Sequence, residues 1–240
     1  MFEKNGESTV NLLAIDCSTT SGSVAVMKDD KLTFMSLLDI RITYSERLLP
    51  QIDFGLKQSK LQVSDLDLLV LANGPGSFTG LRIALATLKG FSIAHKIPIL
   101  PVNTLFMLAQ NVAGTSRAIM PILDAKMNEV YAALYSSDFQ EIMAPQNAKP
   151  TEFLQKIDRP IVAVGNGLKK YENILQELKI DYQKPPLQQN FHNAVTLLQI
   201  ALQQPELPKY DMEKIAVLEP FYLRRSQAEI VKENKEKEKL

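Results

Sequence analysis

Tryptophan is absent from the 240-residue chain, and cysteine and histidine are scarce. The single cysteine, Cys17, can form neither an intramolecular disulfide nor a cysteine-based zinc site, which is typical of a protein from a reducing compartment. The two histidines, His95 and His192, are far apart in sequence and form no H-x-x-x-H or H-E-x-x-H motif. The sequence therefore contains no redox pair, no histidine-based metal motif and no order of residues that suggests a Ser-His-Asp triad.

Charge of one sign is also missing, because 27 Lys and Arg residues balance 27 Asp and Glu residues. A chain without net charge lacks the positive field that drives autonomous binding to phosphate backbones, so we expect contact with nucleic acid only through a partner. The longest apolar run near the N-terminus, Leu12 to Ile15, is too short for a signal sequence or a membrane span. We therefore expect a cytoplasmic protein of one large or two small domains, without membrane contact.

Hydrophobic patterning predicts an α/β chain built from two similar units, each with the element order βββαβα. Each unit opens with an apolar strand that ends in an aspartate, Asp16 in the first and Asp124 in the second. The predicted first unit has strands 10–17, 23–28 and 32–37, helix 46–58, strand 68–72, helix 79–94 and a further strand 97–102. The predicted second unit has strands 118–124, 130–135 and 139–143, helix 151–157, strand 161–164 and helix 168–178.

The remaining C-terminal sequence is less regular. Residues 182–208 are rich in Gln, Pro and Asn, which predicts long surface loops around one helical stretch, 194–202. Residues 227–240 carry four Glu and four Lys, which predicts a solvated helix or a frayed tail.

A glycine-rich segment, Asn73 to Arg82 (NGPGSFTGLR), lies between a predicted buried strand and a predicted helix. It matches neither the Walker A motif nor the dinucleotide-binding G-x-G-x-x-G motif. Either its backbone amides hold an anion or its glycines permit tight packing, and we favour packing. The turn Gly165-Asn166-Gly167 presents the same choice. Asp16 and Asp124 are either ligands for a magnesium-bound phosphate or turn formers at strand ends, and we favour turns.

The predicted helix 79–94 is apolar on nearly all sides, apart from a narrow stripe formed by Arg82 and Lys89. A helix that is apolar all round is buried all round. One face should pack on the sheet, so the other face needs cover either from another element of this chain or from a second protein. The sequence leaves both explanations open.

These segments resemble the bacterial TsaB (YeaZ) family, which acts in the threonylcarbamoyladenosine modification of tRNA. The resemblance covers most of the chain, in family order. It rests on LLAIDCSTTSGSVAV at the start, YSERLLPQID at 44–53, NGPGSFTGLRIALATLKGFS at 73–92, IPILPVNTL at 97–105, DAKMNEVYAALY at 124–135, VGNG at 164–167 and EPFYLRRS at 219–226. Two positions depart from the usual pattern: Cys17 stands where Thr is common, and Tyr44 where His is common.

The resemblance implies a duplicated βββαβα, actin-like (ASKHA, RNase H-type) α/β fold with two lobes, residues 9–104 and 105–226, followed by a charged tail, 227–240. It also implies a non-catalytic paralogue of TsaD, the enzyme that transfers threonylcarbamoyl to the adenosine 3′ of the anticodon in tRNAs that read codons starting with A. TsaD carries metal-binding histidines in an H-x-x-x-H motif, and the matching positions here are Thr104 and Leu108. Both metal-binding histidines are therefore replaced in this sequence.

The same resemblance implies TsaD and the ATPase TsaE as partners, a homodimer when TsaD is absent, and tRNA contact only through the complex. Family members pair with TsaD through the first two helices of the N-terminal lobe. We place the partner interface on Ser45, Glu46, Arg47, Ile52, Thr79, Arg82, Leu85 and Lys89.

The principal alternative is a small actin-like ATPase or kinase with its own nucleotide site. ATP or ADP with Mg²⁺ would then bind in the cleft between the lobes or at the partner interface. The candidate residues for such a site are Asp16, Ser18, Asp124, Gly165 and Gly167. A third reading, the glycoprotease name that similar proteins often carry, has no supporting nucleophile or metal motif in this sequence.

Overall fold

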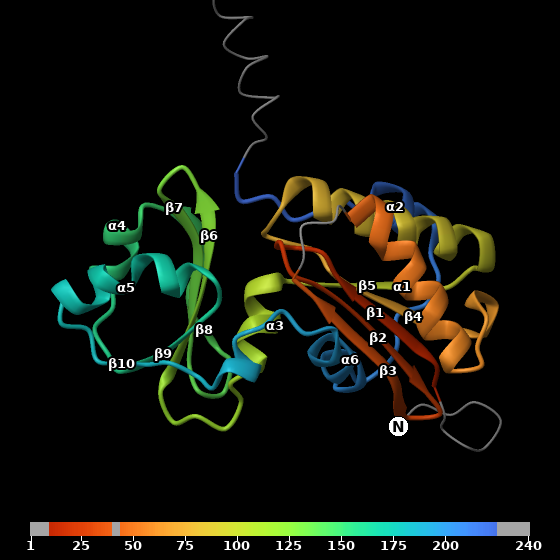
Figure 1. Ribbon diagram of the computed structural model, residues 1–240, viewed down its shortest axis with the longest axis horizontal. Helices are drawn as coiled ribbons and strands as arrows, with labels where there is room; N and C mark the ends of the chain where they lie inside the picture. The colour runs from red at the N-terminus through yellow and green to blue at the C-terminus, as the bar shows by residue number, and fades with distance from the viewer. Residues whose placement is uncertain (1–9, 40–43, 225–240) are drawn as a thin grey trace, which may run out of the picture.

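A computed structural model describes residues 10–39 and 44–224. These residues form two lobes, each built around one five-stranded sheet (Figure 1). The first sheet has the strand order β3-β2-β1-β4-β5, and the second has the order β8-β7-β6-β9-β10. In each sheet the first three strands pair antiparallel as a meander, and the last two are added in parallel. The predicted duplication and the actin-like α/β fold are therefore confirmed.

The first lobe follows the predicted element order closely. Its elements are β1 (Leu12–Asp16), β2 (Gly22–Lys28), β3 (Lys31–Leu38), α1 (Tyr44–Gln58), the 3₁₀ turn η1 (Val63–Asp65), β4 (Leu68–Ala72), α2 (Phe78–His95) and β5 (Ile99–Val102). Strand β4 has the predicted bounds, because a short apolar run buried on both faces and bounded by turn residues allows little choice of ends.

The second lobe repeats this order with shorter helices. Its elements are β6 (Ala118–Lys126), β7 (Glu129–Tyr135), β8 (Glu141–Ala148), α4 (Pro150–Leu154), β9 (Ile161–Val164), α5 (Gly167–Glu177) and β10 (Tyr182–Gln183), followed by the 3₁₀ turn η2 (Leu187–Gln189). The two-residue strand β10 lies in the stretch predicted to be loop, and it is too short to show a periodic pattern.

Helices cover both faces of the first sheet. Leu13 and Ile15 of β1 belong to a core that includes residues of α1 and α2. Leu12 and Ala14, which point to the opposite face, belong to a core shared with α6 (Ala194–Leu202). Alternate residues of this one strand therefore face different helical layers, and both layers are apolar.

Helix α6 corrects the prediction that residues 182–208 mainly form surface loops. Its bounds match the predicted helical stretch, but it is buried and packs against β1, β2 and β4 of the first lobe. Together with α3 (Thr104–Gln110), which contacts β6, β7 and α6, it lies between the two sheets (Figure 1). One apolar core thus extends from β1 to β6, β7 and β9. The lobe boundary at 104/105 stays a prediction. Helix α6 comes after that boundary in the sequence, but it packs on the sheet of the first lobe.

The sequence patterns missed two helices, α3 and α7 (Met212–Val217), which have only seven and six residues. The predicted tail, 227–240, and the predicted lobe start at residue 9 lie outside the described residues. Among the described residues, no helix is both long and apolar enough to cross a membrane.

Candidate functional site

Helix α2 occupies the centre of the helical layer on one face of the first sheet. Ser77 caps its start by accepting a hydrogen bond from the Gly80 amide, and Lys96 ends it in a left-handed conformation. Its inner face consists of Leu81, Ala84, Leu85 and Leu88, which are all 6% exposed or less. This side of the apolar helix is therefore covered by the sheet, as the sequence predicted.

The chain itself covers one flank of α2 with its C-terminal segment, residues 211–222. Lys89 donates a hydrogen bond from Nζ to the carbonyl of Ala216 at 2.8 Å. Arg82 donates from Nε to the hydroxyl of Tyr222 at 2.9 Å, and the ring of Tyr222 stacks on Phe78 with centroids 4.5 Å apart. The polar stripe of α2, Arg82 and Lys89, therefore holds this segment in place. On that side, α2 is covered by its own chain and not by a second protein.

The outward side of α2, between α1 and α7, remains exposed. Its residues Thr79, Ala86, Gly90 and Ile93 follow helical spacing, and Ile93 is 46% exposed. A Cβ atom built on Gly90 would meet nothing within 4 Å, so the surface is open there. We call these four residues the α2 strip. On the neighbouring helix α1, Leu49 is also exposed, at 52%.

The eight predicted interface residues divide into an exposed group and a buried group. Ser45, Glu46, Thr79 and Arg82 are exposed, and Lys89 is half-buried. Arg47, Ile52 and Leu85 are buried, with exposures of 6%, 1% and 6%. The interface itself stays a prediction, but those three side chains pack inside the protein. The residues of α2 itself are apolar on nearly every side, so its sequence did not reveal which side faces the sheet.

Arg47 has a visible structural role inside the first lobe. Its Nη2 donates to the carbonyl of Thr20 at 2.8 Å, and its guanidinium lies 4.2 Å from the ring centroid of Tyr44. Tyr44 in turn donates from its hydroxyl to the carbonyl of Thr19 at 2.5 Å. These contacts fix the start of α1 against the turn that follows β1.

Asp16, at the end of β1, is fully buried among partners from this chain. Its Oδ1 accepts from the Ser18 amide at 2.7 Å, and its Oδ2 lies 2.9 Å from Nδ1 of His192. The Ser18 hydroxyl also contacts Nδ1, at 3.0 Å. A Ser-His-Asp triad needs its serine and aspartate on different ring nitrogens, so this cluster is not arranged for nucleophilic catalysis. No sequence pattern indicated His192 at this position, because the contact spans 176 residues.

Asp124, the counterpart of Asp16 in the second lobe, has a more open environment. Its Oδ1 lies 3.0 Å from Nζ of Lys170, and its Oδ2 lies 3.3 Å from Nζ of Lys126. Burial alone would raise the pKa of this carboxyl group, but the hydrogen bonds from Lys170 and Lys126 outweigh it and lower the pKa. Its backbone amide donates to Oδ1 of Asn166, which ties the strand end to the Gly165-Asn166-Gly167 turn.

A short segment before α6 connects these two strand-end turns. Asn190 accepts a hydrogen bond from the Gly165 amide at 2.7 Å, and His192, two residues later, contacts Asp16 and Ser18. The sequence prediction brought Asp16, Ser18, Asp124, Gly165 and Gly167 together as weak nucleotide-site candidates. In the structure, Asp16, Ser18 and the backbone amide of Gly165 each form hydrogen bonds with side chains of this chain.

The glycine-rich segment packs against the residues that follow β1. The Ser77 amide donates to the carbonyl of Ser18 at 2.7 Å, and the Gly74 amide donates to the Thr104 hydroxyl at 3.1 Å. A side chain at Gly76 or Gly80 would collide with the carbonyl oxygens of Ser18 or Cys17. This close backbone approach gives the glycines a packing role, as favoured from the sequence.

The two positions that match the metal ligands of TsaD lie at the start and middle of α3. Thr104 and Leu108 are both fully buried, and Leu108 belongs to the core between the lobes. Within residues 10–39 and 44–224, no three His, Cys, Asp or Glu side chains gather in a way that could hold a metal ion.

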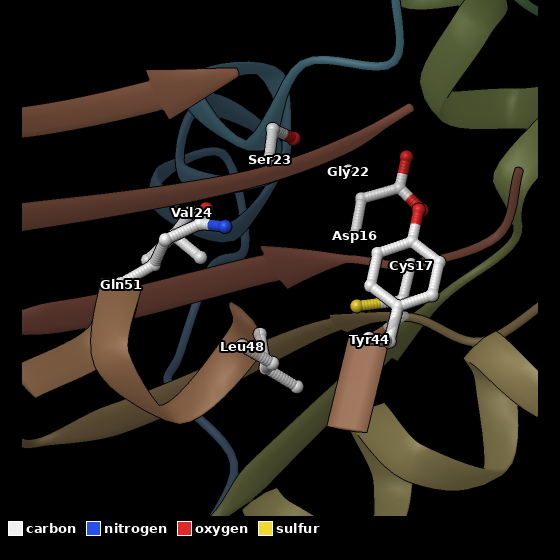
Figure 2. A pocket seen from close by; sticks show the side chains of 8 residues that line it. All are labelled: Asp16, Cys17, Gly22, Ser23, Val24, Tyr44, Leu48 and Gln51. Atoms are coloured by element: carbon white, nitrogen blue, oxygen red, sulfur yellow. The ribbon is translucent and has the colours of Figure 1, made fainter. Parts of the chain in front are cut away.

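A small hollow lies between the end of β1 and the start of α1 (Figure 2). Its eight lining residues include Asp16, Cys17 and Tyr44, but it is too narrow to hold a water molecule. Burial, followed by the nearby Asp16 carboxylate, raises the pKa of the Cys17 thiol well above its usual value. Burial likewise raises the pKa of the Tyr44 hydroxyl. Both of the positions that depart from the family pattern therefore carry neutral, packed side chains.

We expect Cys17 to be unreactive in the folded protein. The thiolate is the reactive form, and both the raised pKa and the 1% exposure of Cys17 oppose its reaction. An aromatic disulfide reagent at pH 8 should label less than about a tenth of the native protein in the time that it labels urea-unfolded protein completely. Rapid stoichiometric labelling without urea would contradict the buried placement of this residue.

Comparison with known proteins places the chain in a family. The model of the TsaD family, tRNA N6-adenosine threonylcarbamoyltransferase, matches residues 41–232. The tRNA threonylcarbamoyladenosine biosynthesis protein TsaB of Haemophilus influenzae is 30% identical over 231 residues, which cover 90% of this chain and 94% of that protein. The chain belongs to the TsaB family. TsaB of Escherichia coli is 31% identical over 178 residues, which cover 70% of this chain and 76% of that protein.

A solved structure supports the fold of this TsaB-family chain. YeaZ from Pseudomonas aeruginosa superposes with a TM-score of 0.70 at 24% identity, over 89% of this chain and 100% of that one. At this level of identity the likeness concerns the fold alone. The family assignment confirms the resemblance drawn from the sequence motifs. The match of the TsaD model to residues 41–232 agrees with the kinship to TsaD that the resemblance implied.

Proposed function

We propose that this chain is a non-catalytic scaffold that pairs with TsaD through the outward face of α1 and α2. The pair, joined by TsaE, would transfer threonylcarbamoyl to the adenosine 3′ of the anticodon in tRNAs that read codons starting with A. The observation that carries the proposal is the α2 strip, a row of small and apolar residues that this chain leaves uncovered. Small residues on a helix permit the close approach of another helix.

The choice of TsaD as partner rests on the shared fold. The TsaD model matches residues 41–232, a range that includes both helices of the proposed surface. A partner with the same two helices can present a similar face, so two related chains can pair about an approximate twofold axis. The same face would join two copies of this chain when TsaD is absent.

The non-catalytic role is supported by the state of the residues that catalysis would need. Thr104 and Leu108 stand where TsaD has its metal-binding histidines, and both are buried. Asp16, the first candidate for binding a magnesium-bound phosphate, is fully buried and bonded to Ser18 and His192. We therefore propose that the partner supplies the chemistry, the metal and most of the contact with tRNA, and that this chain needs no nucleotide of its own.

The test is the formation of a complex with TsaD from the same organism, measured by size-exclusion chromatography with light scattering. We expect a mixed complex with the native chain and at least a tenfold loss of affinity with Ala86→Glu, because a charge at the centre of the strip must be desolvated on binding. The substitution should leave the melting temperature nearly unchanged, since Ala86 is exposed and Glu is a good helix former.

Asn173→Glu provides a matched control, since Asn173 is an exposed residue on α5 of the second lobe. It should bind TsaD as the native chain does. If the native chain does not bind TsaD but releases heat on titration with ATP and Mg²⁺, the scaffold proposal is wrong. That result would favour the actin-like ATPase or kinase.

A further inference from the structure

The chain crosses from the second lobe back to the first in residues 189–194, between η2 and α6 (Figure 1). We call this stretch the interlobe segment. It follows β10 of the second sheet and leads into α6, which packs on the first sheet. A connection between two lobes is either a flexible hinge or a fixed brace, and its hydrogen bonds decide between the two.

One end of the interlobe segment is tied to the second lobe. Oδ1 of Asn190 accepts a hydrogen bond from the Gly165 amide at 2.7 Å. Gly165 follows β9 with a φ of 115°, a conformation that favours glycine. A side chain at this position would collide with the carbonyl oxygen of Ile122 in β6, so the turn lies tightly against the second sheet. Asn190 is therefore bonded to a fixed point of the second lobe.

The other end of the interlobe segment is tied to the first lobe by buried polar groups. Nδ1 of His192 lies 2.9 Å from Oδ2 of Asp16 and 3.0 Å from the Ser18 hydroxyl. The Ala194 amide donates to the Ser23 hydroxyl of β2 at 2.8 Å. The side chains of these four polar residues are all 2% exposed or less. Buried polar groups are costly to leave without a partner, so this end is firmly held.

A side chain at the end of α3 holds the backbone between these two attachments. Nδ2 of Asn111 donates to the carbonyl of Gln189 at 3.2 Å and to that of Phe191 at 2.7 Å. Its Oδ1 accepts a hydrogen bond from the Thr196 hydroxyl of α6 at 2.6 Å. Both polar atoms of this one amide group are therefore used to fix the interlobe segment and the helix that follows it.

We propose that the interlobe segment is an internal brace that holds the two lobes in one relative position by its own contacts. It engages the groups that were candidates for a nucleotide site, because Asp16, Ser18 and the Gly165 amide all bond to it. A ligand between the two strand-end turns could reach these groups only by displacing the interlobe segment. The proposal does not depend on TsaD, since it concerns contacts within this chain.

A measurement of the distance between the lobes tests the proposal. Spin labels on Gln58→Cys, at the exposed end of α1, and on Asn173→Cys, in α5, report this distance by pulsed electron paramagnetic resonance. Cys17 is 1% exposed, so it stays unlabelled. We expect one narrow distance distribution when the interlobe segment is native. Asn190→Ala removes the acceptor for the Gly165 amide, and the width of the distribution should then about double.

Two substitutions of asparagine by aspartate should have opposite effects. Asn190→Asp keeps an oxygen acceptor for the Gly165 amide, so the distribution should stay narrow. Asn111→Asp replaces the donor of two hydrogen bonds by an acceptor that repels both carbonyl groups, so the distribution should broaden. Opposite results from the same chemical change would show that the hydrogen bonds themselves hold the lobes.

Leu134→Ala is the control for a loss of stability alone. Leu134 is 1% exposed in a core formed by residues of the second lobe. This substitution should lower the melting temperature but leave the distribution narrow. If Asn190→Ala and Asn111→Asp also stay narrow, the proposal is overturned, because the apolar core alone then fixes the lobes. Equal broadening in Leu134→Ala, or a native distribution that becomes narrow only with ATP and Mg²⁺, would overturn it as well.

Discussion

Asp16→Ala should lower the free energy of unfolding by about 2–4 kcal/mol, because each buried hydrogen-bonding group that loses its partner costs about 1–3 kcal/mol. Asp16 is 0% exposed, and its loss would leave the amide of Ser18 without its acceptor and Nδ1 of His192 with the Ser18 hydroxyl alone. The free energy should be measured by urea unfolding at pH 7. An unchanged dependence on urea concentration would indicate that the variant still unfolds in the same cooperative transition.

Asp124→Ala is the natural control, because the duplicated fold places Asp124 in the equivalent strand, two residues before its end at Lys126. Its partners Lys126 and Lys170 have side-chain exposures of 77% and 42%. Ion pairs with such exposed groups contribute about 1 kcal/mol or less, so this variant should be nearly as stable as the native chain. A small effect at both positions would contradict the structural role that we assign to the Asp16 cluster.

The difference between these two aspartates shows where sequence reasoning reached its limit. Local patterns placed both aspartates at or near the end of an apolar strand, because an apolar run followed by aspartate and a turn is a short-range signal. Strand β1 ends at Asp16, whereas β6 continues two residues beyond Asp124, to Lys126. The environment of Asp16 depends on His192, which is 176 residues away and lies just before α6. No local pattern encodes such a contact, so the sequence could name Asp16 as a candidate without indicating its partner.

The helices follow the same division between local and tertiary signals. Helix α6 has the predicted bounds, since its apolar run is long and Asn193 caps its start. Its burial between the lobes was missed, because the flanking Gln and Pro residues suggested exposed loops. Helix α7 has six residues and its stability comes from packing on α2, so periodicity alone could not establish it.

Orientation was the hardest property to predict for α2. Its residues are apolar on nearly every side, so the existence and length of the helix could be predicted, but not which side faces the sheet. The sheet selects Leu81, Leu85 and Leu88 as the inward residues, while Ala86 and Gly90 face outward. The partner surface predicted from the sequence stays a prediction, and it includes Leu85, which points into the core.

Leu85→Glu should consequently destabilise the whole protein. Leu85 is 6% exposed and packs in the core formed by β1, β4, α1 and α7. The substitution removes a buried apolar side chain and forces a carboxylate into its place, and together these should cost more than about 4 kcal/mol. Because whole proteins are stable by only about 5–15 kcal/mol, a large unfolded or aggregated fraction is expected at 37 °C.

Thermal unfolding followed by circular dichroism, with Leu85→Met and Ala86→Glu measured beside it, separates stability from binding. Leu85→Met nearly conserves volume and should cost less than about 1.5 kcal/mol. Ala86→Glu places the same carboxylate one residue later, where it points to solvent, and should melt with the native chain. Leu85→Glu would then fail to bind TsaD only because it unfolds, whereas Ala86→Glu would fail to bind TsaD although it is folded. A Leu85→Glu variant that melts normally but fails to bind would show that α2 is rotated, with Leu85 in the interface and Ala86 turned inward.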